Sequence, residues 1–475
     1  MKTKFNLLSK GVFALLAAII THNFSFAQVK KDAKPNIILI YADDMGYGDL
    51  QSYGNTDART PTIDGIGTEG VRFTQAYVTA SICSPSRAGL ITGKYQQSFG
   101  YEFQASSGPI GDPVYEKVRG VPETETTIAQ FLKAQGYSTG VIGKWHLGFN
   151  DKFLPKNKGF DYFFGFNTNT SLLYKDTLNS YIVNKKIDAI HDKIAWTRNG
   201  LSAIKENDNV VDVEEYLTFR FADEASKFIE KNKEKPFFLY LPFNAPVAPL
   251  QVPASYYDKF GHIANFDKRA YIAALAALDD AVAKVLNTLK QNGLEENTIV
   301  FFISDNGGPT TRVANNSPLK GGKFGYYEGG IRIPYFIKWP GKIPAGTVYE
   351  KPVSTLDVFA TIADAVNTPL PKDKQGVSLL PFLNSSNDKT PHEKLFWRYG
   401  AQKAARVGDW KLIKNGEKLS LYNIEKDKEE IHEISSQNKK KTKELLAELE
   451  NWEKTLKAPL WPETSSSPNI QKTTQ

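Results

Sequence analysis

Five short polar stretches hold the residues of this chain that are best suited to chemistry. The first, Asp43-Asp44, directly follows an apolar run of strand length, and the second, Asp305-Asn306, follows another such run. If both runs are strands of one parallel sheet, three carboxylates and one amide reach the same edge of that sheet. Clustered carboxylates repel one another unless a cation compensates them, and oxygen ligands favour a hard ion such as calcium or magnesium. Either motif by itself is also compatible with a helix cap or a turn.

The third stretch contains the only cysteine, Cys83, in the order Cys-Ser-Pro-Ser-Arg. Ser84-Pro85 predicts the start of a helix, because proline is tolerated in the first turn. Cys83 then lies at the positive end of the helix dipole, with Arg87 four residues further along the same face. These residues leave three interpretations open: an anion site, a catalytic thiolate, and a buried cysteine that acts as a small hydrophobic residue.

The fourth stretch is Gly-Lys-Trp-His-Leu-Gly, in which Lys144 and His146 follow a strand-like segment. Side chains two residues apart on a strand point the same way, so both can donate to one anion. A half-exposed strand end without a ligand fits the same pattern. The fifth stretch is a glycine-rich loop with Lys320 and Lys323, which as single surface lysines are more often simply solvated.

Apolar runs and helical periodicity indicate the elements that position these residues. Three runs, over residues 35–42, 236–241 and 298–303, are apolar enough for strands that are buried on both faces. A helical pattern over residues 271–293 lies between two of them and ends at Asn-Gly. A further strand is expected over residues 71–78. Strands that alternate with helices predict an α/β fold, with a large and mostly parallel mixed sheet sandwiched by helices.

The pattern of apolar and polar residues along the chain changes near residue 368. Alternating segments flank Asn415-Gly416, which is a strong signal for a β-hairpin. A charged helix is expected over residues 439–457. We therefore predict a smaller C-terminal α+β domain, built from an antiparallel sheet and a helix.

The N-terminus has the pattern of a secretory signal peptide, with basic residues, a short apolar stretch and Ser25-Phe26-Ala27. The apolar stretch is too short to cross a bilayer, which takes ~20 residues. We expect an exported protein, periplasmic or secreted, without a membrane anchor. Loss of this leader, which holds three lysines and no acidic residue, lowers the net charge from +7 to +4, and such a mildly basic chain does not indicate nucleic-acid binding. The expected organisation is a signal peptide over 1–27, a catalytic domain over 28–367, the smaller domain over 368–460 and a disordered tail over 461–475.

Taken in order, the stretches "ADDMG", "CSPSR", "GKWHLG", "SDNGG" and "LKGGK" followed by "YEGGIRIP" make the chain similar to the formylglycine-dependent sulfatases. These enzymes belong to the alkaline phosphatase superfamily, and the likeness is to exported bacterial polysaccharide and aryl sulfatases. It extends to "RVGDWKLI" and "LYNIEKD" in the smaller domain, and thus covers nearly all of the chain after the leader.

The resemblance implies that Cys83 is oxidised during biosynthesis to formylglycine by a sulfatase-maturing enzyme. The hydrated aldehyde is a geminal diol, and one of its hydroxyls attacks the sulfur of a sulfate ester. The second hydroxyl then loses its proton, the aldehyde forms again and sulfate leaves. The resemblance also implies one calcium ion, whose ligands are Asp43, Asp44, residue 83, Asp305 and Asn306.

For the remaining site residues the resemblance implies contacts with sulfate and with the nucleophile. Lys144 and Lys323 hold the sulfate oxygens. His146 hydrogen-bonds the second hydroxyl and acts as the base when sulfate is eliminated. Arg87 braces the formylglycine electrostatically. Loss of a donor of this kind typically costs ~10²–10³ in rate.

One position departs from the family pattern. Sulfatases usually carry a histidine after the strand expected at 236–241, where this chain has Val247. Valine cannot protonate a leaving oxygen, so the general acid is in doubt. Lys323 can serve instead, or His191 or His262 can reach in from a loop. The valine is equally compatible with a leaving group that needs little protonation, and with a water molecule that fills the gap.

The expected activity is hydrolysis of sulfate esters on a sulfated glycan or oligosaccharide. A phosphonate or phosphate ester hydrolase of the same superfamily is a competing hypothesis. A zinc phosphatase in this fold needs several histidine ligands, and only His146 lies in one of the motifs above. A third hypothesis, a non-catalytic glycan-binding protein, rests on Val247 alone.

Overall fold

The structure is a computed structural model that describes residues 34–105, 113–174, 181–184, 198–247, 250–384 and 387–463. The expected leader over 1–27 lies outside these ranges, as does His191. Across the described residues we find no helix with the length and apolar character that spanning a membrane requires.

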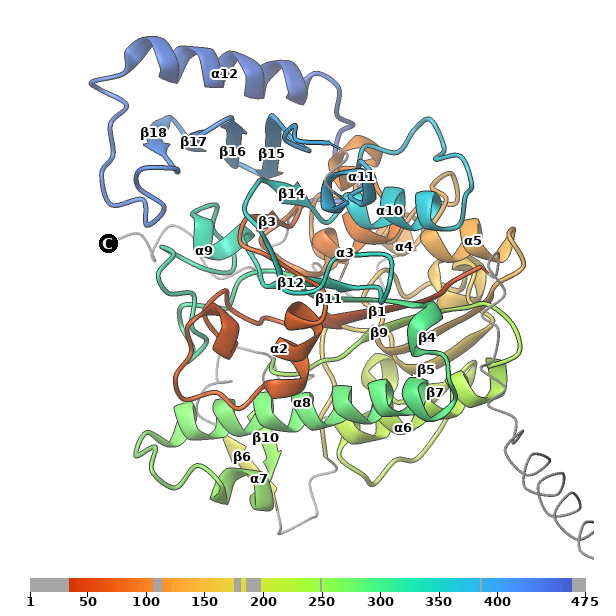
Figure 1. The fold of residues 1–475 in the computed structure, drawn as a ribbon. Helices are drawn as coiled ribbons and strands as arrows, with labels where there is room; N and C mark the ends of the chain where they lie inside the picture. Colours follow the sequence, from red (N-terminus) through yellow and green to blue (C-terminus); the bar gives the residue numbers. More distant parts are fainter. Residues whose placement is uncertain are drawn as a thin grey trace, which may run out of the picture. The chain divides into compact units, whose positions relative to one another are not determined.

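A ten-stranded mixed sheet forms the centre of the described chain (Figure 1). Its five central strands are parallel neighbours, and the strands beyond them on both sides are mostly antiparallel. The α/β class and the mostly parallel sheet are therefore confirmed. In spatial order the strands are β13 (Thr347–Tyr349), β2 (Val71–Phe73), β12 (Tyr335–Lys338), β11 (Thr298–Ser304), β1 (Asn36–Ala42), β9 (Phe237–Pro242), β4 (Ser138–Lys144), β5 (Tyr162–Phe166), β7 (Lys205–Glu206) and β8 (Asn209–Val210).

Helices cover both faces of this sheet, as Figure 1 shows. Alternate residues of β1 enter two separate hydrophobic cores: Leu39 packs with α3, α5 and α10, and Ile40 packs with α2, α6 and α8. A strand between two apolar layers needs apolar side chains at every position, which explains the continuous runs of the sequence. The helices are α3 (Cys83–Thr92), α5 (Ile128–Lys133) and α10 (Asp357–Ala365) on one face, and α2 (Pro61–Thr68), α6 (Leu217–Asn232) and α8 (Phe266–Gln291) on the other.

Two expected elements differ from the observed ones. Helix α8 begins five residues before the expected start, because the side chain of Asn265 caps it by accepting a hydrogen bond from the Lys268 amide at 2.9 Å. The expected strand over 71–78 is broken into β2 and β3 (Ala76–Tyr77). The second piece pairs in parallel with β14 (Val353–Ser354), outside the large sheet.

The C-terminal region forms the predicted antiparallel sheet, with strands β15 (Lys394–Tyr399), β16 (Gln402–Val407), β17 (Trp410–Asn415) and β18 (Lys418–Asn423). The predicted hairpin joins β17 to β18, and its two-residue turn is Gly416-Glu417, with Gly416 at φ 58°. Helix α12 (Lys439–Glu453) contacts this sheet. Trp452 of α12 stacks on Phe396 with ring centroids 5.3 Å apart.

The expected disordered tail starts too early at residue 461. Trp461 is buried, its indole nitrogen donates to the Gln104 carbonyl at 3.1 Å, and its ring packs edge-on against Tyr101. The remaining short elements are α4 (Pro113–Glu116), β6 (Tyr181–Asn184), β10 (Leu250–Pro253), α7 (Ala254–Asp258), α9 (Glu328–Ile331) and α11 (Leu380–Leu383).

Candidate active site

The two predicted acidic motifs meet at the carboxyl edge of the large sheet. Ala42 is directly opposite Ser304 in the parallel pair of β1 and β11, so Asp43 and Asp305 leave neighbouring strands at the same level. The Asp305 amide donates to the Ala42 carbonyl at 3.0 Å, and the Asp305 carboxylate accepts from the Asp44 amide at 3.0 Å. Asp44 has a left-handed backbone, with φ 63°, which turns the chain sharply after the strand.

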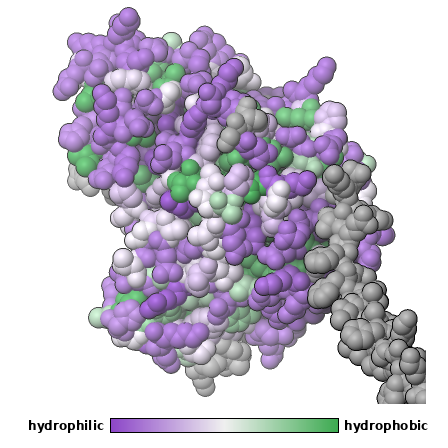
Figure 2. Space-filling view, viewed as in Figure 1, coloured by the Kyte–Doolittle hydropathy of each residue, from purple (hydrophilic) through white to green (hydrophobic). Residues whose placement is uncertain are grey.

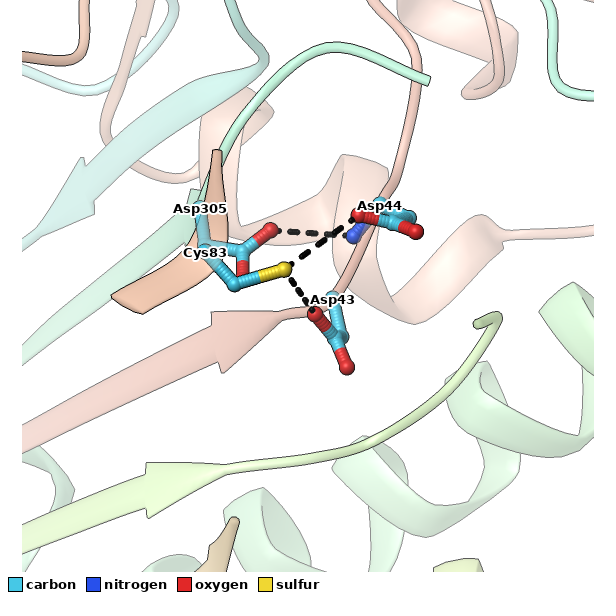
Figure 3. Close-up of side chains that lie close together, drawn as sticks. All are labelled: Asp43, Asp44, Cys83 and Asp305. Carbon is cyan, nitrogen blue, oxygen red and sulfur yellow. Dashed lines mark hydrogen bonds between the residues drawn. The ribbon is translucent and has the colours of Figure 1, made fainter. Parts of the chain in front are cut away.

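Cys83 is the first residue of α3 and lies against these carboxylates (Figure 3). Its Sγ is 3.4 Å from Asp43 Oδ1 and 3.6 Å from Asp44 Oδ1. One ligand atom from each of Asp43, Asp44, Cys83 and Asp305 lies within 4.8 Å of the others. All four residues are buried, so the thiol is placed among acids at the floor of the site.

Three cations surround the acids. Lys144 Nζ is 2.7 Å from Asp43 Oδ2, and Lys323 Nζ is 2.5 Å from Asp44 Oδ1 and 3.2 Å from the Cys83 sulfur. Arg87 donates from Nη2 to Asp305 Oδ2 at 2.9 Å.

Arg87 also joins the cysteine helix to two strands of the sheet. Its Nη1 donates to the Lys144 carbonyl at 3.0 Å, and its guanidinium lies over the Tyr41 ring. The structure thus brings together seven of the residues that the sequence singled out: Asp43, Asp44, Cys83, Asp305, Arg87, Lys144 and Lys323.

Burial and charge act in opposite directions on these carboxyl groups. Burial alone raises the pKa of Asp43, but the adjacent Lys144 and Arg87 charges outweigh it and hold that pKa well below its usual range. The pKa of Asp305 is raised to about 7, by burial and by the negative charge of Asp43. Burial likewise raises the pKa of the Cys83 thiol, with Asp305 adding to the effect. An unmodified Cys83 is therefore a poor thiolate nucleophile here.

The donor set fits a bound cation. Asn306 Oδ1 and Asp44 Oδ2 are buried and accept no hydrogen bond from any described residue. An orphaned buried oxygen is costly unless a partner such as a metal ion completes it. The amide nitrogen of Asn306 donates to Asp44 Oδ1 at 2.8 Å, so the amide is held in place beside the carboxylate. Carboxylate and amide oxygens suit a hard divalent ion.

His146 reaches the site by a different route from the expected one. Strand β4 ends at Lys144, and His146 lies beyond it with φ 56°, so strand alternation does not set its direction. Its amide donates to the Asn167 carbonyl at 3.1 Å, which holds it at the end of β5. Burial, followed by the Lys144 and Arg87 charges, holds the pKa of His146 well below its usual value, so the imidazole is neutral.

The loop that carries Lys323 is held by backbone contacts on two sides. The Lys323 amide donates to the Gly308 carbonyl at 3.1 Å, and the Phe324 amide donates to the Ser81 carbonyl at 2.9 Å. A Cβ on Gly322 would lie 2.2 Å from the Gly308 carbonyl oxygen, so only glycine permits this approach. The loop is therefore fixed between the segment after β11 and the turn before Cys83.

Arg312 is a site residue that the sequence did not reveal. Its Nη1 lies 3.8 Å from Asp44 Oδ2, and 11% of its side chain remains exposed. It follows the "SDNGG" stretch on an irregular loop, where no periodicity marks it. The only available signal is an arginine in the same loop as two metal-ligand candidates.

The position that departs from the family pattern lies close to the metal-ligand turn. The Ala245 carbonyl accepts from the Asp43 amide at 3.1 Å, and Val247 follows two residues later, buried. His262, one of the candidate proton donors, is exposed between α7 and α8. Lys323 is the candidate donor that the structure does place within reach of Cys83.

Comparisons with known proteins agree with this geometry. Residues 35–368 match the sulfatase family, and residues 322–458 match the C-terminal region of N-sulphoglucosamine sulphohydrolase. The chain is 34% identical to arylsulfatase D of Homo sapiens over 426 residues, which are 76% of this chain and 70% of that protein. It is 31% identical to the steryl-sulfatase of Rattus norvegicus over 446 residues, with coverages of 80% and 76%.

Among solved structures, Ps i-CgsB in complex with k-i-k-neocarrahexaose matches with a TM-score of 0.80 and 32% identity, covering 91% of this chain and 96% of that one. Family, relatives and fold point to one chemistry, the cleavage of sulfate esters. The chain belongs to the sulfatase family, in the alkaline phosphatase superfamily, and is a sulfuric ester hydrolase.

Proposed function

We propose that this sulfatase removes sulfate from a sulfated carbohydrate, with a formylglycine derived from Cys83 as the nucleophile. The observation that carries the proposal is the buried cluster of Asp43, Asp44, Cys83 and Asp305 ringed by cations. A sulfate ester is an anion, and this ring supplies positive charge where the acids alone would repel it. The structural match bound to k-i-k-neocarrahexaose favours a saccharide over an aryl or steryl substrate.

The burial of Cys83 supports formylglycine over a thiol as the working group. A thiol held protonated is a weak nucleophile, whereas a hydrated aldehyde presents two hydroxyls on one carbon. One hydroxyl forms the bond to sulfur as the alcohol leaves. Loss of the proton from the other hydroxyl lets the C–O bond to the sulfate break, so the aldehyde forms again and free sulfate departs.

Two lysines bind the sulfate in this proposal. Lys323 lies against the Cys83 sulfur, so its ammonium is adjacent to any group that is bonded to this side chain. Lys144 approaches from β4, beside Asp43. Both lysines donate to the sulfate oxygens. Arg87 acts on the nucleophile indirectly, because it donates a hydrogen bond to Asp305, which lies beside residue 83.

His146 acts as the base for the second hydroxyl. Burial and the Lys144 and Arg87 charges hold its pKa well below the ordinary value, so the imidazole is in the neutral form that a general base requires. Proton acceptance at this residue completes the release of sulfate from the diol.

Five residues would hold a calcium ion in the site: Asp43, Asp44, Asp305, Asn306 and residue 83. When bound, the ion offsets charge on the sulfate and lowers the pKa of the attacking hydroxyl. The orphaned oxygens of Asn306 and Asp44 support this assignment, since both are available to a cation.

Export supports a carbohydrate substrate as well. The signal-peptide pattern over residues 1–27 predicts that the chain acts in the periplasm or outside the cell, where polymeric glycans are met. Formation of formylglycine at residue 83 requires a sulfatase-maturing enzyme to act on the Cys-Ser-Pro-Ser-Arg segment during biosynthesis.

Peptide mass spectrometry of the tryptic fragment that contains residue 83 tests the nucleophile. Replacement of CH2SH by CHO lowers the peptide mass by about 18 Da. Protein expressed with its own leader, in a host that modifies such cysteines, is expected to carry the lighter peptide. An unmodified cysteine in protein that still cleaves sulfate esters would refute the formylglycine assignment.

The substrate class is tested by comparing kcat/KM on sulfated oligosaccharides, on an aryl sulfate and on an aryl phosphonate with the same leaving group. The proposal expects the saccharide to be preferred and the phosphonate to be the poorest of the three. A preference for the phosphonate would favour phosphonate hydrolysis, the competing activity within the superfamily. Cys83→Ala is the control, and it must abolish turnover of all three.

A further inference from the structure

Glu430 of the C-terminal region forms hydrogen bonds with the Lys323 loop on both sides of the lysine. The backbone carbonyl of Glu430 accepts from Lys320 Nζ at 3.0 Å, three residues before Lys323. The carboxylate of Glu430 accepts from the backbone amide of Glu328 at 2.6 Å, five residues after Lys323. Glu430 belongs to the segment between β18 and α12, and is thus more than a hundred positions away in the chain, with separations of 110 and 102.

A buried ion network holds Glu430 itself. Lys411 of β17 places its Nζ 2.7 Å from Glu328 Oε1 and 2.9 Å from Glu430 Oε1. The side chains of all three residues are fully buried. Removing one member of such a buried group leaves an uncompensated charge, so the three are held as a unit.

The far end of this network is anchored in the catalytic region. Tyr77 of β3 donates to Glu328 Oε2 at 2.6 Å, and Arg332 pairs with the same oxygen at 3.4 Å. Arg406 of β16 hydrogen-bonds the Tyr77 hydroxyl from the opposite side. The loop is therefore linked both to β16 and β17 of the C-terminal sheet and to β3 of the catalytic region.

The backbone of Glu430 is itself unusual. Its φ is 52°, a left-handed conformation that costs a residue other than glycine of the order of 1 kcal/mol. Asparagine or glycine suits this conformation better, but neither supplies a carboxylate that reaches both Lys411 and the Glu328 amide. The left-handed backbone of Glu430 therefore coincides with the side-chain contacts that link this residue to the Lys323 loop.

We propose that Glu430 is a positioning residue for Lys323: it holds both flanks of the loop so that the Lys323 ammonium stays against residue 83. The inference rests on the proposed function, which assigns the sulfate oxygens to Lys323. Because Lys323 Nζ is 3.2 Å from the Cys83 sulfur, a shift of about 1 Å in the loop removes this contact, and misplacement on that scale can cost ~10²-fold in rate.

A first measurement asks whether the loop depends on Glu430, without using activity. Hydrogen exchange followed by mass spectrometry is measured on the peptide over residues 319–328 in the wild type, Glu430→Ala and Glu417→Ala. Glu417 lies in the turn between β17 and β18 with a fully exposed side chain, and is the matched control. We expect faster exchange of this peptide in Glu430→Ala alone. Unchanged exchange in Glu430→Ala would overturn the inference.

A double-mutant cycle then separates positioning of Lys323 from general support of the fold. Glu430→Ala is expected to lower kcat/KM ~10–10²-fold in the wild-type background and less than ~2-fold in a Lys323→Ala background, because its effect passes through that lysine. Equal losses in the two backgrounds would show a merely structural role and overturn the inference.

Both variants keep the backbone carbonyl that Lys320 contacts, and the milder Glu430→Gln also keeps one side-chain acceptor for the Glu328 amide. It is expected to lie between the wild type and Glu430→Ala in both measurements, and it replaces Glu430→Ala in the cycle if that variant does not fold. If the wild type cleaves no sulfate ester, the proposed function fails, while the exchange experiment still decides whether Glu430 holds the loop.

Discussion

At the residue scale, the site brings three buried carboxylates together by matching them with three buried or nearly buried cations. Lys144 pairs with Asp43 and Lys323 with Asp44, while Arg87 pairs with both Asp305 and Asp43. In the proposed function the same cations have a second use, because they bind the anionic sulfate. Charge that stabilises the folded site is thus already arranged for the substrate, so little reorganisation is needed at the moment of reaction.

Val247 predicts how the rate depends on the leaving group. Valine cannot donate a proton to the departing oxygen, so we expect kcat to fall steeply as the pKa of the leaving alcohol rises across a series of sulfate esters. Val247→His is expected to restore a proton donor and to raise kcat for an alkyl sulfate by ~10²-fold, with little change for an activated aryl sulfate. Equal effects of Val247→His on both esters would contradict this prediction, and Val247→Ala controls for the change in packing.

Arg312 predicts a further contribution to substrate binding. Its side chain is 11% exposed, so we expect its guanidinium to contact an anionic substrate. Figure 2 shows one face of the molecule, coloured by hydropathy, and most of that face is hydrophilic. Arg312→Ala is expected to raise KM ~10-fold or more for an anionic saccharide with little change in kcat, since the lost interaction is made before the chemical step. Arg312→Lys restores the charge and should recover part of the affinity. A fall in kcat at unchanged KM would place Arg312 in the chemistry instead.

Motifs at strand ends were predictable from sequence, and the geometry between them was only partly so. Asp43 and Asp305 were found because each directly follows an apolar strand. His146 was singled out from its motif, but its backbone conformation was not foreseen, because a left-handed residue breaks the alternation of the strand before it. Arg312 lay on an irregular loop, where neither periodicity nor spacing identifies a partner.

At the element scale, the small antiparallel sheet contributes charges to the catalytic region. Lys411 of β17 and Arg406 of β16 both reach groups beneath the active-site loop. The sequence predicted this sheet and its hairpin from alternation and from Asn415-Gly416. The sequence could not predict the contacts of Lys411 and Arg406. An alternating segment that contains a buried basic residue looks the same whether the partner of that residue is near in the chain or far from it.

The ion network predicts how the stability of the enzyme depends on pH. Burial raises the pKa of the Glu430 carboxyl to about 7, with Lys411 opposing the rise and Glu328 adding to it. The groups that face it are Lys320, Glu328, Lys411 and Tyr422. Because the folded state binds this proton more tightly than the unfolded state, whose pKa is near 4.5, the stabilising contribution is complete below pH 4.5 and is lost as the pH rises through 7.

Urea unfolding of the wild type and Glu430→Gln at pH 5 and pH 8 measures this effect. The glutamine variant has no proton to lose, so we expect it to gain up to ~3 kcal/mol relative to the wild type between the two pH values. Glu417→Gln serves as the control and should show no such change. The same difference in free energy of unfolding at both pH values would contradict the raised pKa.

At the scale of the whole molecule, bound metal and stability are linked. The acids of the site already have cations as partners, so we expect metal-free protein to remain folded but to be less stable. Calcium at a free concentration 10³ times its Kd is expected to stabilise the protein by ~4 kcal/mol and to raise Tm accordingly. Thermal unfolding with EDTA, then with calcium or magnesium restored, measures the shift and identifies the preferred ion. An Asn306→Ala variant should lose part of that shift, and an unchanged shift in this variant would contradict the ligand assignment.

The contacts between Glu430 and the Lys323 loop have a consequence for the order of events during synthesis of the chain. The ribosome synthesises Lys320 and Glu328 more than a hundred residues before Glu430, with separations of 110 and 102 positions. A nascent chain can therefore form the elements that carry the acids and the cysteine before Glu430 is available to contact the Lys323 loop. Under the proposed function, such a chain would be available for oxidation at residue 83 before it is competent to act on substrate, so translation itself would separate the time of maturation from the time of activity.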